Sequence, residues 1–439
     1  MKIIVKRLIK KCSIDKRFVT NFSKLICGTA SAQFVGIVTI PILTQIYGVE
    51  AYGVQAVYVS IASIMGIFAT GKYEAAILLP EDDEKGFLLS CLVILLSIIF
   101  SVIWYLGYSV FSDEIFVYFC GIDVLYWLQW LPFTLIATSL YSVVTIYLNR
   151  MKDYSIMATA GVMSSVINFL FAVIYSLVYP DDNFGLYFNT FAGNLVVSII
   201  FIFYCHRKMY FNLSWWSWHG LYGVANVYVN MPKYLLCGST LNELSSRLPV
   251  FLLQGFAGEL VVGWYSMGLK LLGMPLQLVS SAVGNVFLRE AAEEWNKKHN
   301  CWISFKKTLS VLVITGIVPA MLLFFFSCDM FSFFLGNNWY MAGVYCTYLI
   351  PMYYIKFVFS PVSNVLLIAN KQQIFLYLQF CRIIVIYAGM QLGYILYGSA
   401  DAIIAFYGAS FSLYYLIVLM YCVRTSVNKK SPMNCYCKW

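Results

Sequence analysis

Charged side chains are scarce in this sequence of 439 residues: only 11% are Asp, Glu, Lys or Arg, against about 25% in soluble domains. Hydrophobic residues make up 61% of the chain, and the mean hydropathy is +0.77. This shortage of charge predicts a polytopic membrane protein. In such a chain the formal charge of +9 predicts no nucleic-acid partner, because the location of the charges matters more than their sum.

The sequence also lacks the residues that catalysis and cofactor binding need. Its three histidines all fall in predicted loops: His206, His219 and His299. The stretch from Gly66 to Lys72 matches the start of a phosphate-binding loop, but Tyr73 follows where Ser or Thr is required. The 13 cysteines are scattered, mostly within apolar segments, where they pack as small hydrophobic residues. We therefore predict no catalytic residue, no metal site, no cofactor and no disulfide framework.

Long apolar segments are what the sequence has in abundance. Twelve of them come close to the roughly 20 residues that a helix needs to cross the hydrocarbon of a bilayer. They are Phe22–Tyr47, Tyr52–Leu79, Phe87–Phe111, Val124–Leu148, Ser155–Tyr179, Leu186–Cys205, Tyr234–Phe256, Val261–Leu288, Phe305–Ser327, Tyr340–Ile368, Ile374–Leu396 and Ala402–Val423. We therefore predict an all-α fold of about 12 transmembrane helices, in two lobes of six.

The loops between these segments differ in charge. Most of the 29 Lys and Arg residues fall in loops on the side of the N-terminus, and the loops on the opposite side contain none. Because basic loops are retained in the cytoplasm, both chain ends are predicted to be cytoplasmic. The opposite loops are all short, so no extracytoplasmic domain is expected.

These patterns divide the chain into five parts. A basic N-terminal segment (1–21) precedes the first six-helix lobe (22–205). A cytoplasmic connecting loop (206–233) leads to the second six-helix lobe (234–423), and a cytoplasmic tail (424–439) follows. The first part has two interpretations, an amphipathic helix on the membrane surface or a disordered basic tail.

The two predicted lobes share a faint repeat. Pro41, Glu50 and Gly53 follow one another in the first lobe as Pro249, Glu259 and Gly263 do in the second. Six helices in each half give both halves the same orientation. This is the arrangement of transporters built from parallel repeats.

Apart from side chains near the tips of the predicted spans, seven charged residues lie within them: Lys72, Glu74, Glu243, Arg247, Lys270, Lys356 and Arg382. A charge in hydrocarbon is costly, so such residues usually face a protein interior or a wet cavity. Five cations cannot all be neutralised by two carboxylates, and the excess suits an anionic ligand such as a diphosphate. Glu243 and Arg247, one helical turn apart, form either an ion pair that only fixes packing or part of this site. Glu243 and Glu74 are the candidate coupling or ion-pair residues.

A series of short motifs runs through most of the chain, up to about Glu294. They are Gly28–Gln33, Pro41–Thr44, Tyr52-Gly53, Lys72–Pro80, Pro232–Tyr234, Val262–Tyr265, Pro275-Leu276 and Gly284–Ala291. In this order they resemble the bacterial polysaccharide or O-antigen flippases of the multidrug/oligosaccharidyl-lipid/polysaccharide exporter superfamily. The resemblance implies two lobes around a central cationic cavity, and alternating access that carries a polyprenyl-diphosphate-linked oligosaccharide from the inner to the outer leaflet.

We therefore predict a non-enzymatic flippase of the bacterial plasma (inner) membrane for the repeat unit of O-antigen, capsule or exopolysaccharide. The substrate-binding residues of the predicted cationic cavity are Arg247, Lys270, Lys356, Arg382 and Lys72. The expected partners are the lipid-linked oligosaccharide, membrane lipids, a polysaccharide polymerase and glycosyltransferases.

Two alternatives remain open. A membrane-embedded polysaccharide polymerase would be expected to carry basic outer loops, and an acyltransferase a membrane-facing histidine. A drug or cation exporter of the same superfamily would favour acidic sites within the bundle.

Overall fold

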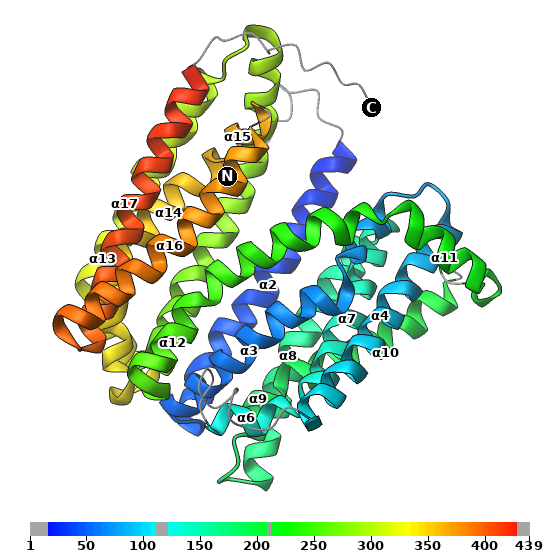
Figure 1. Ribbon diagram of the computed structural model, residues 1–439, viewed down its shortest axis with the longest axis horizontal. Helices are drawn as coiled ribbons and strands as arrows, with labels where there is room; N and C mark the ends of the chain where they lie inside the picture. The colour runs from blue at the N-terminus through cyan, green and yellow to red at the C-terminus, as the bar shows by residue number, and fades with distance from the viewer. Residues whose placement is uncertain (1–15, 111–121, 209, 211, 370, 428–439) are drawn as a thin grey trace. The chain divides into compact units, whose positions relative to one another are not determined.

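The computed structural model describes residues 16–110, 122–208, 210, 212–369 and 371–427. The predicted segment 1–21 lies mostly outside these residues, as does the tail from residue 428. Helices dominate the described part of the chain, which contains no strand (Figure 1). The all-α prediction is confirmed.

The described residues form two compact units. The first takes its residues from Met1–Tyr47, Tyr58–Val117 and Ile122–Thr240, and the second from Gly48–Val57 and Leu241–Trp439. Two helices contribute to both units: α3 (Val49–Thr70) begins in the second unit, and α12 (Leu236–Lys298) begins in the first.

The first unit is a row of packed helices. It contains α2 (Lys16–Ile46), most of α3, η1 (Tyr73–Leu78), α4 (Asp83–Val110), α6 (Ile122–Leu128), α7 (Leu131–Arg150), α8 (Tyr154–Val178), α9 (Phe184–Tyr187), α10 (Asn189–Arg207), η2 (Leu213–Trp215), α11 (Trp218–Val227) and η3 (Met231–Leu235). Helix α2 packs on α8, α8 on α10, α10 on α7, and α7 on α4. Tyr147 lies fully buried in the core between α4, α7 and α11.

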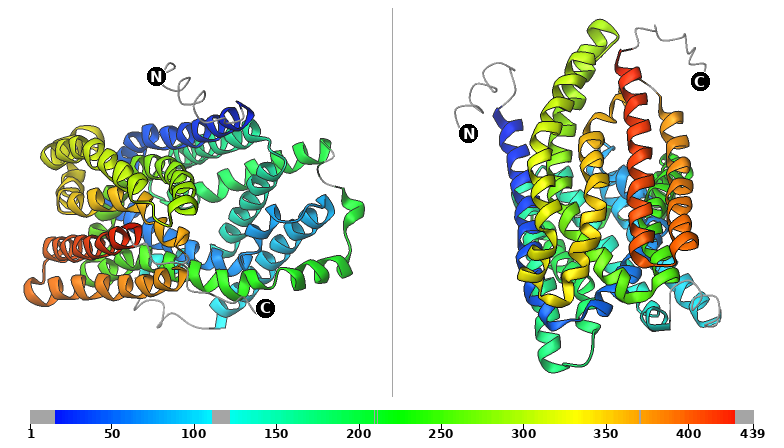
Figure 2. Two further views of the ribbon diagram at one scale, coloured as in Figure 1. Left: turned by 90° about the horizontal axis from the view of Figure 1, so that it is seen from above. Right: turned by 90° about the vertical axis from the view of Figure 1, so that its left-hand side faces the viewer.

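The second unit is built from long helices that lie side by side (Figures 1 and 2). Besides most of α12 it contains α13 (Trp302–Leu335), η4 (Asn337–Trp339), α14 (Tyr340–Val362), α15 (Val365–Ile368), α16 (Gln372–Tyr397) and α17 (Ala400–Val427). Helix α14 packs between α13 and α17, and α16 packs on α17. One end of this unit has a core in which Phe287 of α12 meets Phe305 of α13.

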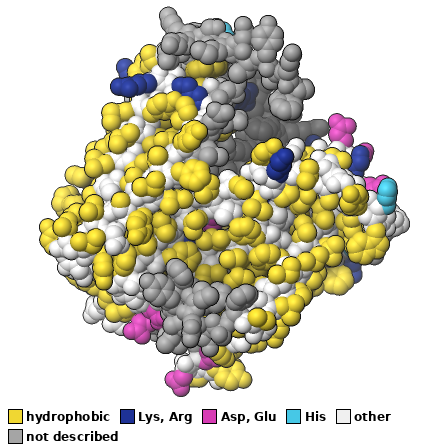
Figure 3. Space-filling view, in the orientation of Figure 1, with side chains coloured by type: hydrophobic (Ala, Val, Ile, Leu, Met, Phe, Trp, Pro, Cys, Tyr) yellow, Lys and Arg dark blue, Asp and Glu magenta, His cyan; other side chains and the backbone are white. Residues whose placement is uncertain are grey.

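The outer faces of these helices are apolar. Phe333 is 83% exposed, and Leu177 is 77% exposed. Figure 3 shows hydrophobic side chains over most of the visible described surface. Large apolar faces of this kind mark contact with another apolar medium, here the lipid of a membrane.

Ten helical stretches of the described residues are long and apolar enough to cross a membrane. The seventh and eighth predicted segments fall together in α12, apart from Tyr234 and Leu235 in η3, and the one stretch counted there is Met231–Met274. The first predicted segment corresponds to α2, of which Ala30–Ile46 is a shorter apolar helix. Each of the twelve predicted segments therefore overlaps a helix of the described residues, although the second, fourth, sixth and tenth are broken by a turn or bend.

Helix α12 is interrupted between the seventh and eighth predicted segments. Gly258 has φ 80° and ψ −179°, a conformation that only glycine adopts readily. Nothing lies within 4 Å of the Cβ that another residue would add there, so the requirement for glycine comes from the backbone rather than from crowding.

Two glycines of the second unit make a reciprocal close contact. A Cβ on Gly53 of α3 would collide with the carbonyl oxygen of Glu259, and a Cβ on Gly263 of α12 would collide with the carbonyl oxygen of Val49. Gly53 comes four residues after Val49 in α3, and Gly263 comes four residues after Glu259 in α12, so each helix offers one glycine and one carbonyl to the other. This two-fold reciprocity supports the repeat noted in the sequence, in which Gly53 corresponds to Gly263.

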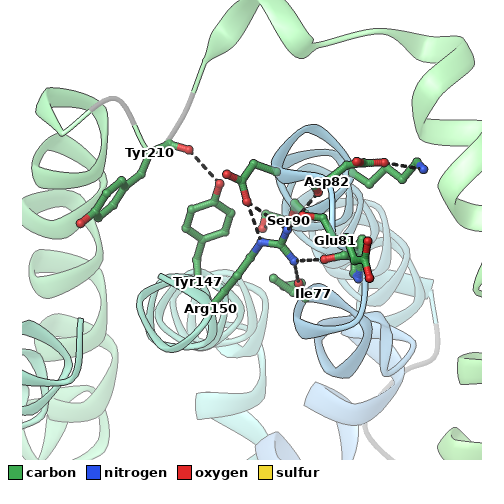
Figure 4. A network of polar contacts seen from close by, with 11 residues as sticks. Ile77, Glu81, Asp82, Ser90, Tyr147, Arg150 and Tyr210 are labelled. Atoms are coloured by element: carbon green, nitrogen blue, oxygen red, sulfur yellow. Dashed lines mark hydrogen bonds and ion pairs between the residues drawn. The ribbon is translucent and has the colours of Figure 1, made fainter. Parts of the chain in front are cut away.

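Arg150, in the last turn of α7, holds the segment between η1 and α4 (Figure 4). Only 8% of its side chain is exposed. Its guanidinium donates hydrogen bonds to four backbone carbonyls and to one carboxylate: those of Ile77, Pro80, Glu81, Asp82 and Asp83, at 2.6 to 3.3 Å. The guanidinium of Arg150 therefore supplies donors to carbonyl groups at the end of η1 and in the turn that follows it, where regular helical hydrogen bonding is interrupted.

Arg150→Lys is expected to destabilise the protein by about 1–3 kcal/mol, because one ammonium cannot reach five acceptors and several carbonyls lose their donor. Arg207→Lys is the matched control, since Arg207 lies in the last turn of α10 but is exposed. Thermal unfolding of the purified protein in detergent measures both. Equal stability of the two variants would show that the Arg150 contacts contribute little.

Candidate functional site

A cavity of about 830 Å³ lies in the second unit. Its walls come from α12, α14, the α14–α15 turn, α15 and α16. On α12 the lining residues recur at helical spacing, with Asn242 and Ser246 in one part and Gly273, Gln277 and Ser281 in the other. This size lies within the range of about 300–1,000 Å³ that is usual for small-molecule sites.

Glu243 and Arg247 face this cavity together. Arg247 Nε lies 2.8 Å from Glu243 Oε1, so the pair expected from the four-residue spacing is formed. Both side chains keep contact with the open space, with 34% of Arg247 and 26% of Glu243 exposed. The ion pair and the cavity wall, which the sequence left as alternatives for these residues, are both present.

Arg382 enters the cavity from α16. Its guanidinium donates to Asn242 Oδ1 at 3.3 Å and to Ser246 Oγ at 3.0 Å, both on α12. The Phe411 ring of α17 lies 5.5 Å from the guanidinium carbon. Arg382 Nε is buried and has no hydrogen-bond partner within the described chain. This cation is thus held in place by neutral groups, and no carboxylate of the described residues forms an ion pair with it.

Lys356, on α14, is the third cation of the cavity wall. Its Nζ lies 5.3 Å from the centre of the Tyr353 ring. Neither Lys356 nor Arg382 forms an ion pair within the described residues. The lining residues contain three cations and a single carboxylate, so the cavity is electropositive. Such a site attracts an anion, to which Arg can donate two parallel hydrogen bonds.

Neutral polar side chains complete the wall. They are the amides and hydroxyls of Asn242, Ser246, Gln277, Ser280, Ser281, Asn285, Ser360, Ser363 and Asn364. Sequence reasoning did not select the serines or Asn242, Asn285 and Asn364, because single polar residues are common in apolar helices. Their helical spacing from the charged residues was the available signal: Asn242 and Ser246 follow the same four-residue step as Glu243 and Arg247.

The other predicted site residues lie elsewhere. Lys270 does not line this cavity; it lies on α12 three residues before Gly273, one turn beyond the wall on the same face. Lys72 and Glu74 lie in the first unit, where Lys72 Nζ is 3.2 Å from Glu74 Oε1. They line a smaller cavity of about 350 Å³. Of the five predicted cations, the structure therefore brings Arg247, Lys356 and Arg382 together.

Comparison with known proteins identifies the family. Residues 42–343, which is more than half of the chain, match the family described as polysaccharide biosynthesis protein. The search of curated proteins found no match.

Several solved structures share the fold. The lipid II flippase MurJ, in its inward closed conformation, has a TM-score of 0.64 and 13% identity, with 92% of this chain and 90% of MurJ covered. A MOP superfamily transporter from Pyrococcus furiosus has a TM-score of 0.61 and 14% identity, with 94% and 96% covered. A variant of the Vibrio cholerae MATE transporter VcmN has a TM-score of 0.57 and 14% identity, with 95% and 97% covered.

These structural neighbours are transporters and a flippase, not enzymes. The match extends over nearly the whole length of each, which includes both units of this chain. The protein belongs to the polysaccharide biosynthesis protein family and has the two-lobed membrane fold of the MOP superfamily transporters.

Proposed function

We propose that this protein is a flippase that moves a polyprenyl-diphosphate-linked oligosaccharide from the inner to the outer leaflet of the bacterial plasma membrane. The observation that carries the proposal is the electropositive cavity of the second unit, in which Arg247, Lys356 and Arg382 face a single carboxylate. A diphosphate is dianionic or more, and it cannot enter a membrane protein without cationic groups to replace its water.

The surrounding wall suits the rest of such a substrate. Amides and hydroxyls can exchange hydrogen bonds with sugar hydroxyl groups. The polyprenyl tail needs no polar contact and can remain in the lipid. In this proposal the repeat unit belongs to O-antigen, capsule or exopolysaccharide, both chain ends are cytoplasmic, and glycosyltransferases and a polymerase act before and after the transfer.

A drug or cation exporter of the same superfamily is the main competing function. An organic cation would meet repulsion from Arg382 and Lys356, neither of which has an ion-pair partner within the described residues. The charge of the cavity therefore favours an anionic substrate.

Deletion of the gene in its host tests the proposal. We expect surface polysaccharide to disappear, and lipid-linked repeat units to accumulate where a glycosidase added to intact spheroplasts cannot reach them. Restoring the gene should make these units accessible again. Accessible lipid-linked units in the deletion strain would contradict a flippase. Sensitivity to cationic drugs with unchanged polysaccharide would favour the exporter.

A further inference from the structure

The smaller cavity of the first unit, which Lys72 and Glu74 line, has a wall rich in hydroxyl groups. It lies where α3, η1, α7, α9 and the start of α10 meet. Nine of its fifteen lining residues carry a hydroxyl group: Tyr58, Ser63, Thr70, Thr134, Thr138, Ser139, Ser142, Tyr187 and Thr190. Another cavity of the same unit, of about 650 Å³, has Ser90 as its only hydroxyl. Hydroxyl groups are therefore concentrated at one place in this unit.

Three of these hydroxyl groups donate their proton to a carbonyl of their own helix. Thr138 Oγ1 donates its proton to Thr134 O at 2.8 Å, and Ser63 Oγ donates to Val59 O at 2.7 Å. Thr70 Oγ1 likewise donates to Gly66 O at 3.2 Å, and it already accepts one hydrogen bond, from the backbone N–H of Lys72 at 3.4 Å. A hydroxyl that donates to its own helix keeps its oxygen lone pairs as acceptors. A ligand that fits this wall must supply several donors.

Lys72 and Glu74 bring one positive and one negative charge to the wall of this cavity, so together they add no net charge. The pair, 3.2 Å apart, is mostly buried: 25% of Lys72 and 12% of Glu74 is exposed. Glu74 Oε2 is buried and has no hydrogen-bond partner within the described chain, so it is a strong acceptor without a donor. The ammonium of Lys72 opposes a second cation, and the carboxylate of Glu74 opposes an anion. The pocket suits a neutral ligand that both donates and accepts hydrogen bonds.

We propose that this pocket binds one uncharged sugar ring. Each sugar hydroxyl can donate to Glu74 or to a Thr or Ser oxygen, and can accept from Lys72. The volume of about 350 Å³ is near the lower end for small-molecule sites, which suits a single ring rather than a chain of several. This inference rests on the proposed function only in that the ring would belong to the transported oligosaccharide.

Binding of free monosaccharides tests the pocket directly. The full-length protein in lipid nanodiscs would be mixed with methyl glucoside, methyl galactoside or N-acetylglucosamine, and saturation-transfer difference NMR would measure contact. We expect a signal for at least one of the three. Thr138→Val removes one acceptor oxygen with almost no change of shape, and should weaken binding about threefold to tenfold, as loss of one hydrogen bond does.

Thr145→Val is the matched control. Thr145 lies two turns further along α7 and does not line the cavity. Its Oγ1 donates to Tyr141 O at 2.9 Å, as the Thr138 hydroxyl donates to a carbonyl of the preceding turn. We expect this variant to bind sugar like the wild type. Ser142→Ala, a second change in the pocket wall, covers the case in which Thr138→Val fails to fold.

The binding experiment tests the sugar pocket separately from the flippase proposal, because the three monosaccharides contain no phosphate. No signal with any of the three sugars, or equal binding by the pocket variants and Thr145→Val, overturns the sugar pocket even if spheroplasts show normal flipping. Sugar binding that is sensitive to Thr138→Val supports the pocket even if the deletion strain shows that the protein is not a flippase.

Discussion

Replacing Arg382 with glutamine is expected to reduce surface polysaccharide at least tenfold while the protein stays at its normal level in the membrane. Glutamine retains a polar amide, although its shorter side chain loses the contacts that the Arg382 guanidinium makes with Asn242 and Ser246 on α12. It removes the charge that an anionic ligand would meet. A hydrogen bond to a charged group contributes about 1.5–3 kcal/mol, so affinity for a diphosphate should fall about 10- to 150-fold.

Two further variants make the result specific. Arg289→Gln is the matched control, because Arg289 lies outside the cavity wall, is paired with Glu293 at 3.4 Å and is mostly exposed. Arg382→Lys keeps the charge but loses the planar fork, and should give an intermediate amount of polysaccharide. Immunoblots of membranes and of surface polysaccharide provide both measurements. Normal polysaccharide from Arg382→Gln would exclude an anion-binding role, and loss of the protein would show that Arg382 is structural.

A substitution of Arg382 tests anion binding more clearly than one of Arg247, the first of the cavity residues predicted from the sequence. Arg247 is paired with Glu243, so its neutralisation leaves a carboxylate without a partner and mixes two effects. The four-residue spacing of Glu243 and Arg247 made their pairing predictable from the sequence. The contact of Arg382 with Asn242 could not be predicted, because the two residues are 140 positions apart and belong to different helices.

The limits of sequence reasoning are also clear at the end of the second predicted span. The apolar run Tyr52–Leu79 predicted one continuous helix, but α3 ends at Thr70. Gly71 and Lys72 take left-handed conformations, with φ of 57° and 61°, and a 3-10 helix follows. Hydropathy does not detect this turn, because the residues after it are as apolar as those before. The turn places Lys72 and Glu74 at the hydroxyl-rich pocket, which periodicity alone did not indicate.

The apolar patterns were sufficient for the larger features. Membrane spans need about 20 apolar residues whatever they pack against, so length and composition were enough to predict an all-α membrane protein, in which ten described stretches can cross a membrane. Cavities depend on which helix faces meet, and this is decided by side chains distant in sequence. The excess of buried cations predicted that a site exists, but could not separate the Arg247, Lys356 and Arg382 group from Lys270 and Lys72.

Gly263→Ala is expected to destabilise the protein clearly more than the same change at the uncrowded helical glycines of α12. The new Cβ would collide with the carbonyl oxygen of Val49, which belongs to the backbone of α3 and cannot rotate away. The two helices would have to separate, at a cost of about 1–3 kcal/mol or more for overpacking. Thermal unfolding in detergent measures this loss. Gly255→Ala is the matched control, because Gly255 lies in the same helix with nothing within 4 Å of its added Cβ.

Gly53→Ala should cause a loss similar to that of Gly263→Ala, because the contact is reciprocal: its Cβ would meet the carbonyl oxygen of Glu259 on α12. The double variant is then the decisive measurement. If one separation of α3 from α12 relieves both collisions, the double variant should lose clearly less stability than the sum of the two single losses. Additive losses would mean that the two glycines act independently, and wild-type stability in either single variant would show that α3 and α12 do not require glycine where they meet.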